Sequence, residues 1–155
     1  MSSCAPWIVI AEDNAPDVFL IREALQWDGM PYRVDAMEDG EQVLQFIDRL
    51  EADLDAACPD LFVIDLNLPK RSGVEILSRI RASSRCAVVP AVVISSSDAP
   101  RDREVAKALG AELYFRKPAE LKEFMTIGGH IRAVLKQGRS DAASPAGRSN
   151  FRSPH

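Results

Sequence analysis

Short runs of consecutive apolar residues alternate along this chain with longer segments in which apolar residues recur every three or four positions. The runs predict strands at 7–11, 61–64, 91–95 and 113–116, and alternation of apolar and polar residues predicts a half-buried strand at 32–36. The periodic segments predict helices at 15–27, 43–57, 73–80, 101–109 and 120–136. Ser96-Ser97-Asp98 is predicted to cap the fourth of these helices, and Gly128-Gly129 is a weak point that interrupts the last. Strands that alternate with helices form parallel sheets through right-handed crossovers. We therefore predict an α/β fold in which a doubly wound parallel sheet of five strands carries helices on both faces.

The third apolar run ends at a carboxylate, Asp65, after which Leu68-Pro69 directs the chain into a loop. Four consecutive apolar residues indicate a strand that is buried on both faces. Open α/β sheets place their active sites at the carboxyl ends of such strands. Taken alone, however, this stretch is equally consistent with an Asp65 that only caps a turn.

Polar residues also end three of the other predicted strands. Glu12 and Asp13 follow the first strand, Ser95 ends the fourth and Lys117 follows the fifth. Because the carboxyl ends of parallel strands meet at one edge of the sheet, these residues and Asp65 are predicted to form one site.

The chemistry of this set points to a metal and to phosphoryl transfer. Carboxylates that repel one another need a cation, and oxygen ligands without His or Cys favour Mg²⁺ over a transition metal. Beside a metal, Asp65 is suited to act as a nucleophile that forms an aspartyl phosphate. Lys117 and the Ser95 hydroxyl would then bind phosphoryl oxygens. Asn14 and Asp17 could also contact this site, although capping of the first helix is the simpler role for at least one of them.

Together with Tyr114 and Lys117-Pro118, this set resembles in order and spacing the receiver domain of two-component response regulators, from about Trp7 to Lys136. The resemblance implies a flavodoxin-like (βα)5 fold with strand order 2-1-3-4-5. It also implies a stand-alone phosphorylation switch in which Asp65 accepts a phosphoryl group from a sensor histidine kinase. Such a protein assists its own phosphorylation and dephosphorylation but is not otherwise an enzyme.

The same resemblance assigns roles to the residues around Asp65. The implied Mg²⁺ ligands are Glu12, Asp13, Asp65 and the backbone carbonyl of Asn67. The implied switch residues are Ser95 and Tyr114, the phosphate-binding residue is Lys117, and the Lys117–Pro118 bond is expected to be a cis peptide. Tyr114 has an alternative role as a half-buried edge aromatic without a switching function.

Two segments narrow the expected partners. Glu12-Asp13-Asn14 with Asp17-Val18, and Leu66-Asn67-Leu68-Pro69-Lys70, are most similar to single-domain regulators that partner phytochrome-type sensor histidine kinases. We expect output to leave through the face formed by the fourth helix, the fifth strand and the fifth helix. Homodimerisation through that face is expected because the fifth strand would be a sheet edge.

Composition bounds the remaining function classes. Residues 1–136 are predicted to form the receiver domain, and 137–155, where three Arg residues accompany one Asp, a disordered basic tail. A net charge of −4 and a pI of about 5.2 argue against DNA or an anionic membrane as a partner. No apolar run is long enough to span a membrane. The three cysteines lack metal-ligand spacing, which indicates reduced thiols and a cytoplasmic protein.

Two alternatives compete with a phosphorylation switch. A Mg²⁺-dependent phosphatase similar to the haloacid dehalogenases also uses an Asp at a strand end, but it needs a general acid two residues later, where this chain has Asn67. A degenerate receiver that serves only as a binding scaffold is the other alternative. A scaffold has no physical need for a cluster of mutually repelling carboxylates.

Overall fold

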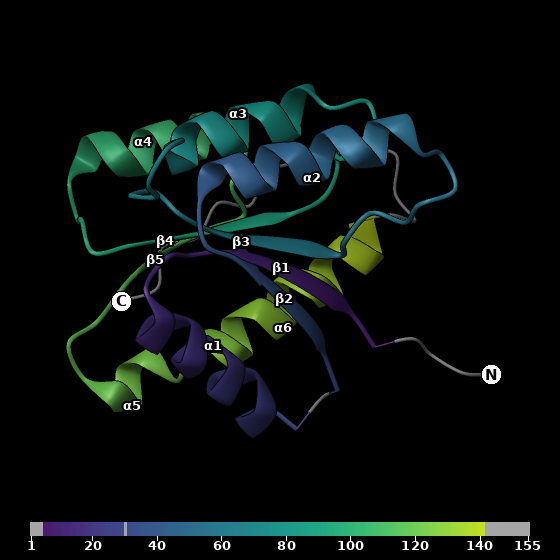
Figure 1. The fold of residues 1–155 in the computed structure, drawn as a ribbon. Coiled ribbons are helices and arrows are strands. Elements are labelled where there is room, and N and C mark those ends of the chain that lie inside the picture. The colour runs from purple at the N-terminus through teal and green to yellow at the C-terminus, as the bar shows by residue number, and fades with distance from the viewer. Residues whose placement is uncertain (1–4, 30, 142–155) are drawn as a thin grey trace.

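A five-stranded parallel sheet lies between two layers of helices in the computed structural model, which describes residues 5–29 and 31–141, with side chains as far as residue 137 (Figure 1). The strands are β1 (Trp7–Ala11), β2 (Arg33–Met37), β3 (Leu61–Asp65), β4 (Ala91–Ser95) and β5 (Leu113–Arg116). The helices are α1 (Ala15–Trp27), α2 (Gly40–Ala52), α3 (Gly73–Ala82), α4 (Pro100–Ala108), α5 (Leu121–Phe124) and α6 (Ile127–Asp141). No helix among the described residues is long and apolar enough to cross a membrane.

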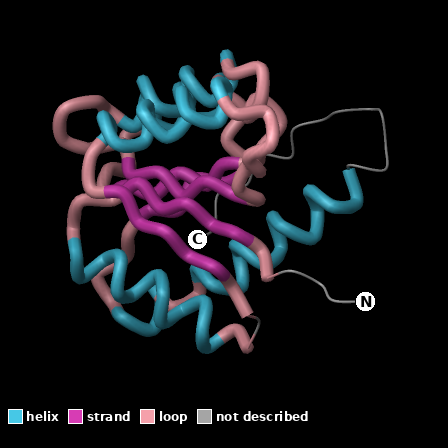
Figure 2. The backbone as a smooth tube through the Cα atoms, turned by 45° about the vertical axis from the view of Figure 1, so that its right-hand side comes forward, coloured by secondary structure: helices cyan, strands magenta, loops and turns pink. Residues whose placement is uncertain are grey.

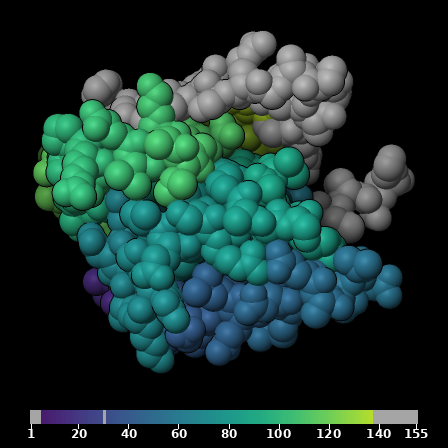
Figure 3. Space-filling model, turned by 90° about the horizontal axis from the view of Figure 1, so that it is seen from above, coloured from purple at the N-terminus to yellow at the C-terminus, as the bar shows by residue number. Residues whose placement is uncertain are grey.

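The strand order is β2-β1-β3-β4-β5, and every neighbouring pair is parallel. The predicted doubly wound α/β fold with order 2-1-3-4-5 is therefore confirmed. Helices α2, α3 and α4 cover one face of the sheet, and α1, α5 and α6 cover the other (Figures 1 and 2). The outer surface of the α2–α3–α4 layer is the face seen in Figure 3.

Alternate side chains of the central strands supply two separate cores. Phe62 and Ile64 of β3 pack in the core beneath α2, α3 and α4, whereas Leu61 and Val63 pack in the core with α1, α5 and α6. All four side chains are fully buried. Burial of an aliphatic or aromatic side chain of this size contributes about 1.5–3 kcal/mol each, so the strand that carries Asp65 is firmly anchored on both faces.

Side-chain caps begin three of the helices. An oxygen of Asn14, Asp39 or Ser72 accepts a hydrogen bond from the first turn of α1, α2 or α3, at 3.0, 2.9 and 3.2 Å respectively. The prediction that Ser96-Ser97-Asp98 caps the fourth helix is wrong, because α4 has Ala99 as its N-cap without a side-chain hydrogen bond. Pro100 starts this helix instead, since its ring fixes a helical φ and it has no N–H to satisfy.

The C-terminal helical region differs from the prediction in two ways. It is divided into α5 and α6 by a break before Ile127 rather than at Gly128-Gly129. Gly128 instead allows close packing, because a Cβ there would lie 2.3 Å from the Ala24 carbonyl oxygen of α1. Helix α6 runs to Asp141, so residues 137–141, predicted to begin the tail, are helical. The rest of the predicted tail, 142–155, lies outside the described residues, and its disorder stays a prediction.

Candidate functional site

Three carboxylates meet at the carboxyl edge of the sheet. Glu12 and Asp13 directly follow β1, and Asp65 ends β3, which pairs with β1 in a register that aligns Ala11 with Ile64. Each of the three acids offers a carboxylate oxygen, and these oxygens lie within 4.8 Å of one another. Glu12 and Asp65 are buried, with exposed fractions of 1% and 4%, whereas Asp13 is exposed. The structure thus brings together the three acids that the sequence predicts as metal ligands.

The ammonium group of Lys117 lies among these acids. Its Nζ is 2.7 Å from Glu12 Oε1, 3.0 Å from Asp65 Oδ2 and 2.8 Å from Asp17 Oδ2. The backbone N–H of Lys117 donates to the Ser95 carbonyl at 2.8 Å, which fixes where the side chain leaves the sheet. Burial lowers the pKa of Lys117, but its contacts with the carboxylates of Asp17, Glu12 and Asp65 outweigh this effect and raise the pKa above its ordinary value. Lys117 therefore remains charged.

Asp17 is the contact that the sequence left open. Asn14 caps α1, since its Oδ1 accepts from the Asp17 N–H, whereas the Asp17 carboxylate binds Lys117. The two residues therefore divide the roles of cap and site contact. The sequence signal for the Asp17 contact was its position three residues after the N-cap Asn14, because a residue there lies in the first helical turn, near the carboxyl edge of the sheet.

The two carboxylate oxygens of Glu12 have different environments. Oε2 accepts a hydrogen bond from the Asn14 N–H at 3.0 Å. Oε1 is buried and accepts no hydrogen bond, because the nearby Lys117 ammonium pairs with it ionically but outside hydrogen-bonding geometry. Burial, and then the hydrogen bond with Asp65, raise the pKa of Glu12 to about 7. An added cation at this edge would satisfy Oε1 and favour the ionised form.

The Asp65 carboxylate is held by groups on both sides. Its Oδ1 accepts from the Asn67 N–H at 2.9 Å, and its Oδ2 accepts from Lys117. Gly73 allows α3 to start against this turn, since a Cβ on Gly73 would lie 2.4 Å from the Asp65 carbonyl oxygen. The role of the Asn67 backbone carbonyl as a metal ligand stays a prediction.

Ser95 and Tyr114 are connected through one residue of the loop after β4. The Ser95 hydroxyl oxygen accepts from the Ser97 N–H at 3.0 Å, and the Tyr114 hydroxyl donates to the Ser97 carbonyl at 2.8 Å. Both Ser95 and Tyr114 are fully buried, so the expectation that Tyr114 is half-buried is wrong, whereas its role as a switch stays a prediction. The side chain of Tyr114 packs in the core beneath α4, where the α4 residue Arg103 covers its ring.

The predicted cis peptide between Lys117 and Pro118 is not present, because the described residues contain no cis peptide bond. The trans form is the lower in energy for bonds to proline, by about 0.5–1 kcal/mol. With a trans bond, the Lys117 amine already reaches three carboxylates. A cis bond is thus not needed to direct this side chain at the site.

The donor set fits a hard divalent cation. Lys117 supplies a single positive charge to the four carboxylates of Glu12, Asp13, Asp17 and Asp65. Carboxylate oxygens are the ligands that Mg²⁺ prefers, and the buried Oε1 of Glu12 lacks a hydrogen-bond donor. The residues present therefore match the predicted magnesium site in ligand type and charge.

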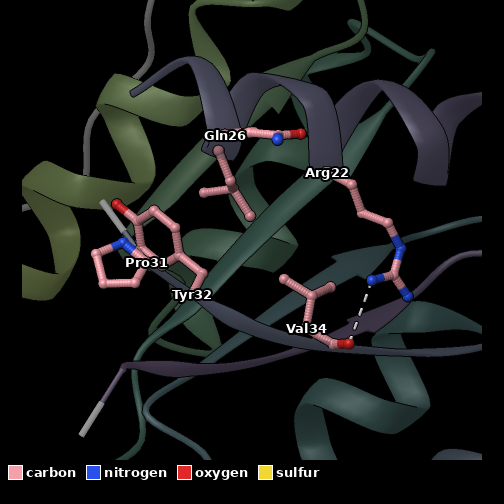
Figure 4. Close-up of a pocket in the computed structure, with 6 residues that line it drawn as sticks. Arg22, Gln26, Pro31, Tyr32 and Val34 are labelled. Atoms are coloured by element: carbon pink, nitrogen blue, oxygen red, sulfur yellow. Dashed lines mark hydrogen bonds between the residues drawn. The ribbon is translucent and has the colours of Figure 1, made fainter. Parts of the chain in front are cut away.

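A separate hollow of about 400 Å³ opens beside the edge strand β2 (Figure 4). It is lined by Arg22, Leu25, Gln26, Pro31, Tyr32 and Val34. Arg22 is the one charged residue of this lining, and its Nη1 donates to the Val34 carbonyl at 3.3 Å. The residues that line the hollow include no carboxylate, so it does not share the chemistry of the acidic edge.

Comparison with known proteins gives a consistent match over this region. Residues 8–127 match the family model described as the response regulator receiver domain. The chain is 31% identical over 116 residues to the probable methanogenesis regulatory protein FilR2 of Methanothrix harundinacea, covering 75% of this chain and 74% of that protein. It is 28% identical over 120 residues to the response regulator Rcp1 of Synechocystis, covering 77% and 82%. It is 31% identical to the transcriptional regulatory protein SphR of Synechococcus elongatus, and it spans about half of that protein's length, 53%.

Two solved structures extend the match to the fold. The Mn²⁺-bound form of response regulator Rcp1 superposes with a TM-score of 0.74 at 26% identity, covering 83% of this chain and 92% of that one. The phosphorylated cyanobacterial phytochrome response regulator RcpA superposes with a TM-score of 0.71 at 30% identity, covering 93% and 98%.

Proposed function

Since the chain belongs to the response regulator receiver domain family, we propose that Asp65 accepts a phosphoryl group from a sensor histidine kinase and that the protein works as a phosphorylation switch. One observation carries this proposal. A buried Asp65 carboxylate lies 3.0 Å from the Lys117 ammonium and within 4.8 Å of two further acids suited to Mg²⁺. A carboxylate nucleophile, a cation for the phosphoryl oxygens and a metal-ligand set are thus gathered in one place.

In the proposed reaction, an Asp65 carboxylate oxygen forms a bond to phosphorus. The bond between phosphorus and the kinase histidine breaks, and its electron pair stays on the imidazole nitrogen. Glu12, Asp13, Asp65 and the Asn67 carbonyl would hold Mg²⁺, which when bound neutralises charge on the phosphoryl oxygens. Lys117 donates to a phosphoryl oxygen from the place where it now contacts Asp65.

The proposed switch uses the connection between Ser95 and Tyr114. The Ser95 hydroxyl accepts from Ser97, so its own proton is available for a phosphoryl oxygen. A shift of Ser95 toward the phosphoryl group would move Ser97, whose carbonyl accepts from the Tyr114 hydroxyl. Phosphorylation would then bias the position of Tyr114 beneath α4, which is a local event with a readout at the surface.

A phytochrome-type sensor kinase is the partner we propose. RcpA, a cyanobacterial phytochrome response regulator, is 30% identical to this chain and matches 93% of it. Output by self-association through α4, β5 and the region of α5 and α6 that was predicted as the fifth helix is proposed as well, because β5 is the sheet edge next to Ser95 and Lys117.

The test is phosphorylation by a small-molecule donor. Incubation with acetyl phosphate and Mg²⁺ should add one acid-labile phosphoryl group per chain, read from intact mass. Asp65→Asn, which keeps the size of the side chain, should add none, and excess chelator should abolish the reaction in the wild type. Phosphorylation that persists in Asp65→Asn would contradict the proposal. If the wild type takes up no phosphoryl group, the binding-scaffold alternative holds instead.

A further inference from the structure

Two cysteines lie side by side at the end of the sheet opposite the acidic site. Cys58 Sγ is 3.7 Å from Cys86 Sγ, although the residues are 28 positions apart in sequence. Cys58 lies in the loop between α2 and β3, and Cys86 lies in the loop between α3 and β4. These loops lead into the amino ends of two neighbouring strands, whereas Asp65 ends β3 at its carboxyl end.

Hydrogen bonds already hold the two loops together. The guanidinium of Arg85 donates to three carbonyls at the end of α2 and in the loop after it, those of Leu50, Asp53 and Ala56. Cys58 Sγ donates to the Arg85 carbonyl at 3.3 Å, and the Cys86 N–H donates to Ser83 Oγ at 3.1 Å. Because both backbones are fixed, joining the sulfurs requires small side-chain rotations rather than the closure of a flexible loop.

We propose that Cys58 and Cys86 are a peroxide-reactive thiol pair that closes to an intramolecular disulfide and ties these loops together. Exposure divides the roles, since Cys58 is half-buried and Cys86 is fully buried. Peroxide therefore reaches the Cys58 sulfur first, whereas Cys86 needs to reach only its neighbour.

The chemistry balances with hydrogen peroxide as the oxidant. The Cys58 sulfur bonds to one peroxide oxygen, the O–O bond breaks, and the leaving hydroxide takes up the thiol proton as water. The Cys86 sulfur then bonds to the Cys58 sulfur, the S–O bond breaks, and a second water carries away the Cys86 proton. Two thiols lose two electrons in total, and the peroxide is reduced to two waters.

The environment of Cys86 makes this thiol unsuited to react with peroxide first. Burial, and then the hydrogen bond with Cys58, raise the pKa of the Cys86 thiol to about 11. Cys86 is therefore protonated and a poor nucleophile toward free peroxide. The Cys86 sulfur therefore reacts only with the Cys58 sulfur, which already lies in contact with it.

The experiment uses the full chain with Cys4→Ser, which removes the remaining cysteine. After treatment with hydrogen peroxide, the protein is denatured, exposed to N-ethylmaleimide and weighed intact. We expect no maleimide addition, a mass lower by two hydrogens, and full reversal by dithiothreitol. Two maleimide additions after peroxide treatment would overturn the proposal and leave the cysteines as apolar core residues.

Single variants and a folding control test the assigned order. With Cys86→Ser, the Cys58 sulfenic acid should accumulate and be trapped by dimedone. With Cys58→Ser, the Cys86 thiol should stay reduced under the same treatment, and equal oxidation of Cys86 there would overturn the order. With both Cys58 and Cys86 present, the disulfide should form faster in the folded protein than in urea. Equal rates in the two conditions would overturn the role of the fold. This comparison does not depend on whether the single variants fold.

Discussion

The guanidinium carbon of Arg103 lies 4.6 Å from the centroid of the Tyr114 ring, so α4 covers the buried tyrosine of β5 with a positive charge. Arg103 is itself oriented by Asp98, whose Oδ1 lies 2.7 Å from its Nη2. The Tyr114 hydroxyl donates to the Ser97 carbonyl. The ring is thus held both at its face, by Arg103, and at its hydroxyl, by the loop that also contacts Ser95.

Tyr114→Phe separates these two contacts because it keeps the ring and removes the hydroxyl. It should lower the free energy of unfolding by about 1 kcal/mol, since the Ser97 carbonyl loses a buried donor. Arg103→Gln is the matched variant that keeps the hydroxyl and removes the cation, at a cost of about 0.5–2 kcal/mol. Urea unfolding measures both. A Tyr114→Phe protein as stable as the wild type would show that the hydroxyl bond contributes nothing.

The site residues that could be predicted from the sequence are those whose positions depend only on where a strand ends. Asp65 ends an apolar run, and parallel pairing brings it to Glu12 whatever the details of the loops. The Asp17–Lys117 contact joins residues 100 positions apart, and it depends on the α1 start and the β5 end together. The local pattern places Asp17 in the first helical turn near the strand edge, but it does not show that Asp17 pairs with Lys117.

Backbone details were less predictable for a related reason. Small energies decide between a cis and a trans bond before Pro118, and between a hydroxyl cap and Pro100 at the start of α4. Packing against elements distant in sequence is likewise not visible in the local pattern. Gly128, for example, appears in the sequence as a weak point of a helix but lies against the Ala24 carbonyl of α1.

Mg²⁺ should stabilise the folded protein, because the acidic cluster exists only in that state. A cation at roughly 100 times its dissociation constant adds about 2.7 kcal/mol to the free energy of unfolding. The melting temperature of the wild type should therefore rise with millimolar Mg²⁺, and Asp13→Ala should weaken the response. A melting temperature indifferent to Mg²⁺ would count against the assigned ligands.

Asp65→Asn tests the repulsion within the same cluster without any metal. The Asp65 carboxylate is among the causes of the raised pKa of Glu12, although burial is the larger one. Removing the Asp65 charge relieves this repulsion, so the metal-free variant should melt at a higher temperature than the metal-free wild type. A lower melting temperature would show that the ion pair with Lys117 outweighs the repulsion.

Ser95→Ala should separate phosphorylation from the switch. The variant keeps Asp65 and Lys117, so it should still accept a phosphoryl group. It lacks the hydroxyl that joins the phosphoryl group to Ser97, so the response at Tyr114 should be lost. NMR spectra with and without beryllofluoride report the response, and Ser95→Thr, which restores a hydroxyl, is the control. Equal shifts at Tyr114 in Ser95→Ala and the wild type would remove Ser95 from the switch.

The burial of the His130 ring leads to the prediction that stability depends on pH independently of the acidic site. Its ring contacts that of Phe115 at 5.8 Å, and burial lowers its pKa below the ordinary 6.5. The unfolded chain then binds a proton more readily than the folded one, so stability should fall as the pH drops below about 6.5. His130→Gln should remove this part of the slope. Urea unfolding of the wild type and of His130→Gln at pH 7.5 and 5.5 measures how the free energy of unfolding changes with pH. An identical change in the two proteins would contradict the assignment.

The surface around β5 leads to the prediction that phosphorylation drives self-association. The side chains of Leu113, Tyr114 and Phe115 are buried, so an aromatic edge is not what a partner would meet. The exposed groups of α4 and α5 include the apolar Leu121 and charges of both signs, Arg101 and Glu104 on α4 with Lys122 and Glu123 on α5. Charges of both signs on one surface can pair reciprocally across a two-fold axis.

Such pairs contribute little individually when exposed, about 0–1 kcal/mol each, so a dimer held by them requires several pairs aligned at once. A shift of Tyr114 beneath α4 would change that alignment, because Arg103 of α4 covers its ring. We therefore expect sedimentation velocity to show a dimer at tens of micromolar only with beryllofluoride and Mg²⁺. Glu104→Arg, which reverses one exposed charge far from Asp65 in sequence, should weaken the dimer but keep phosphorylation. A wild type that stays monomeric in both states would mean that this face binds a different protein, because the fold offers β5 as the edge next to the site.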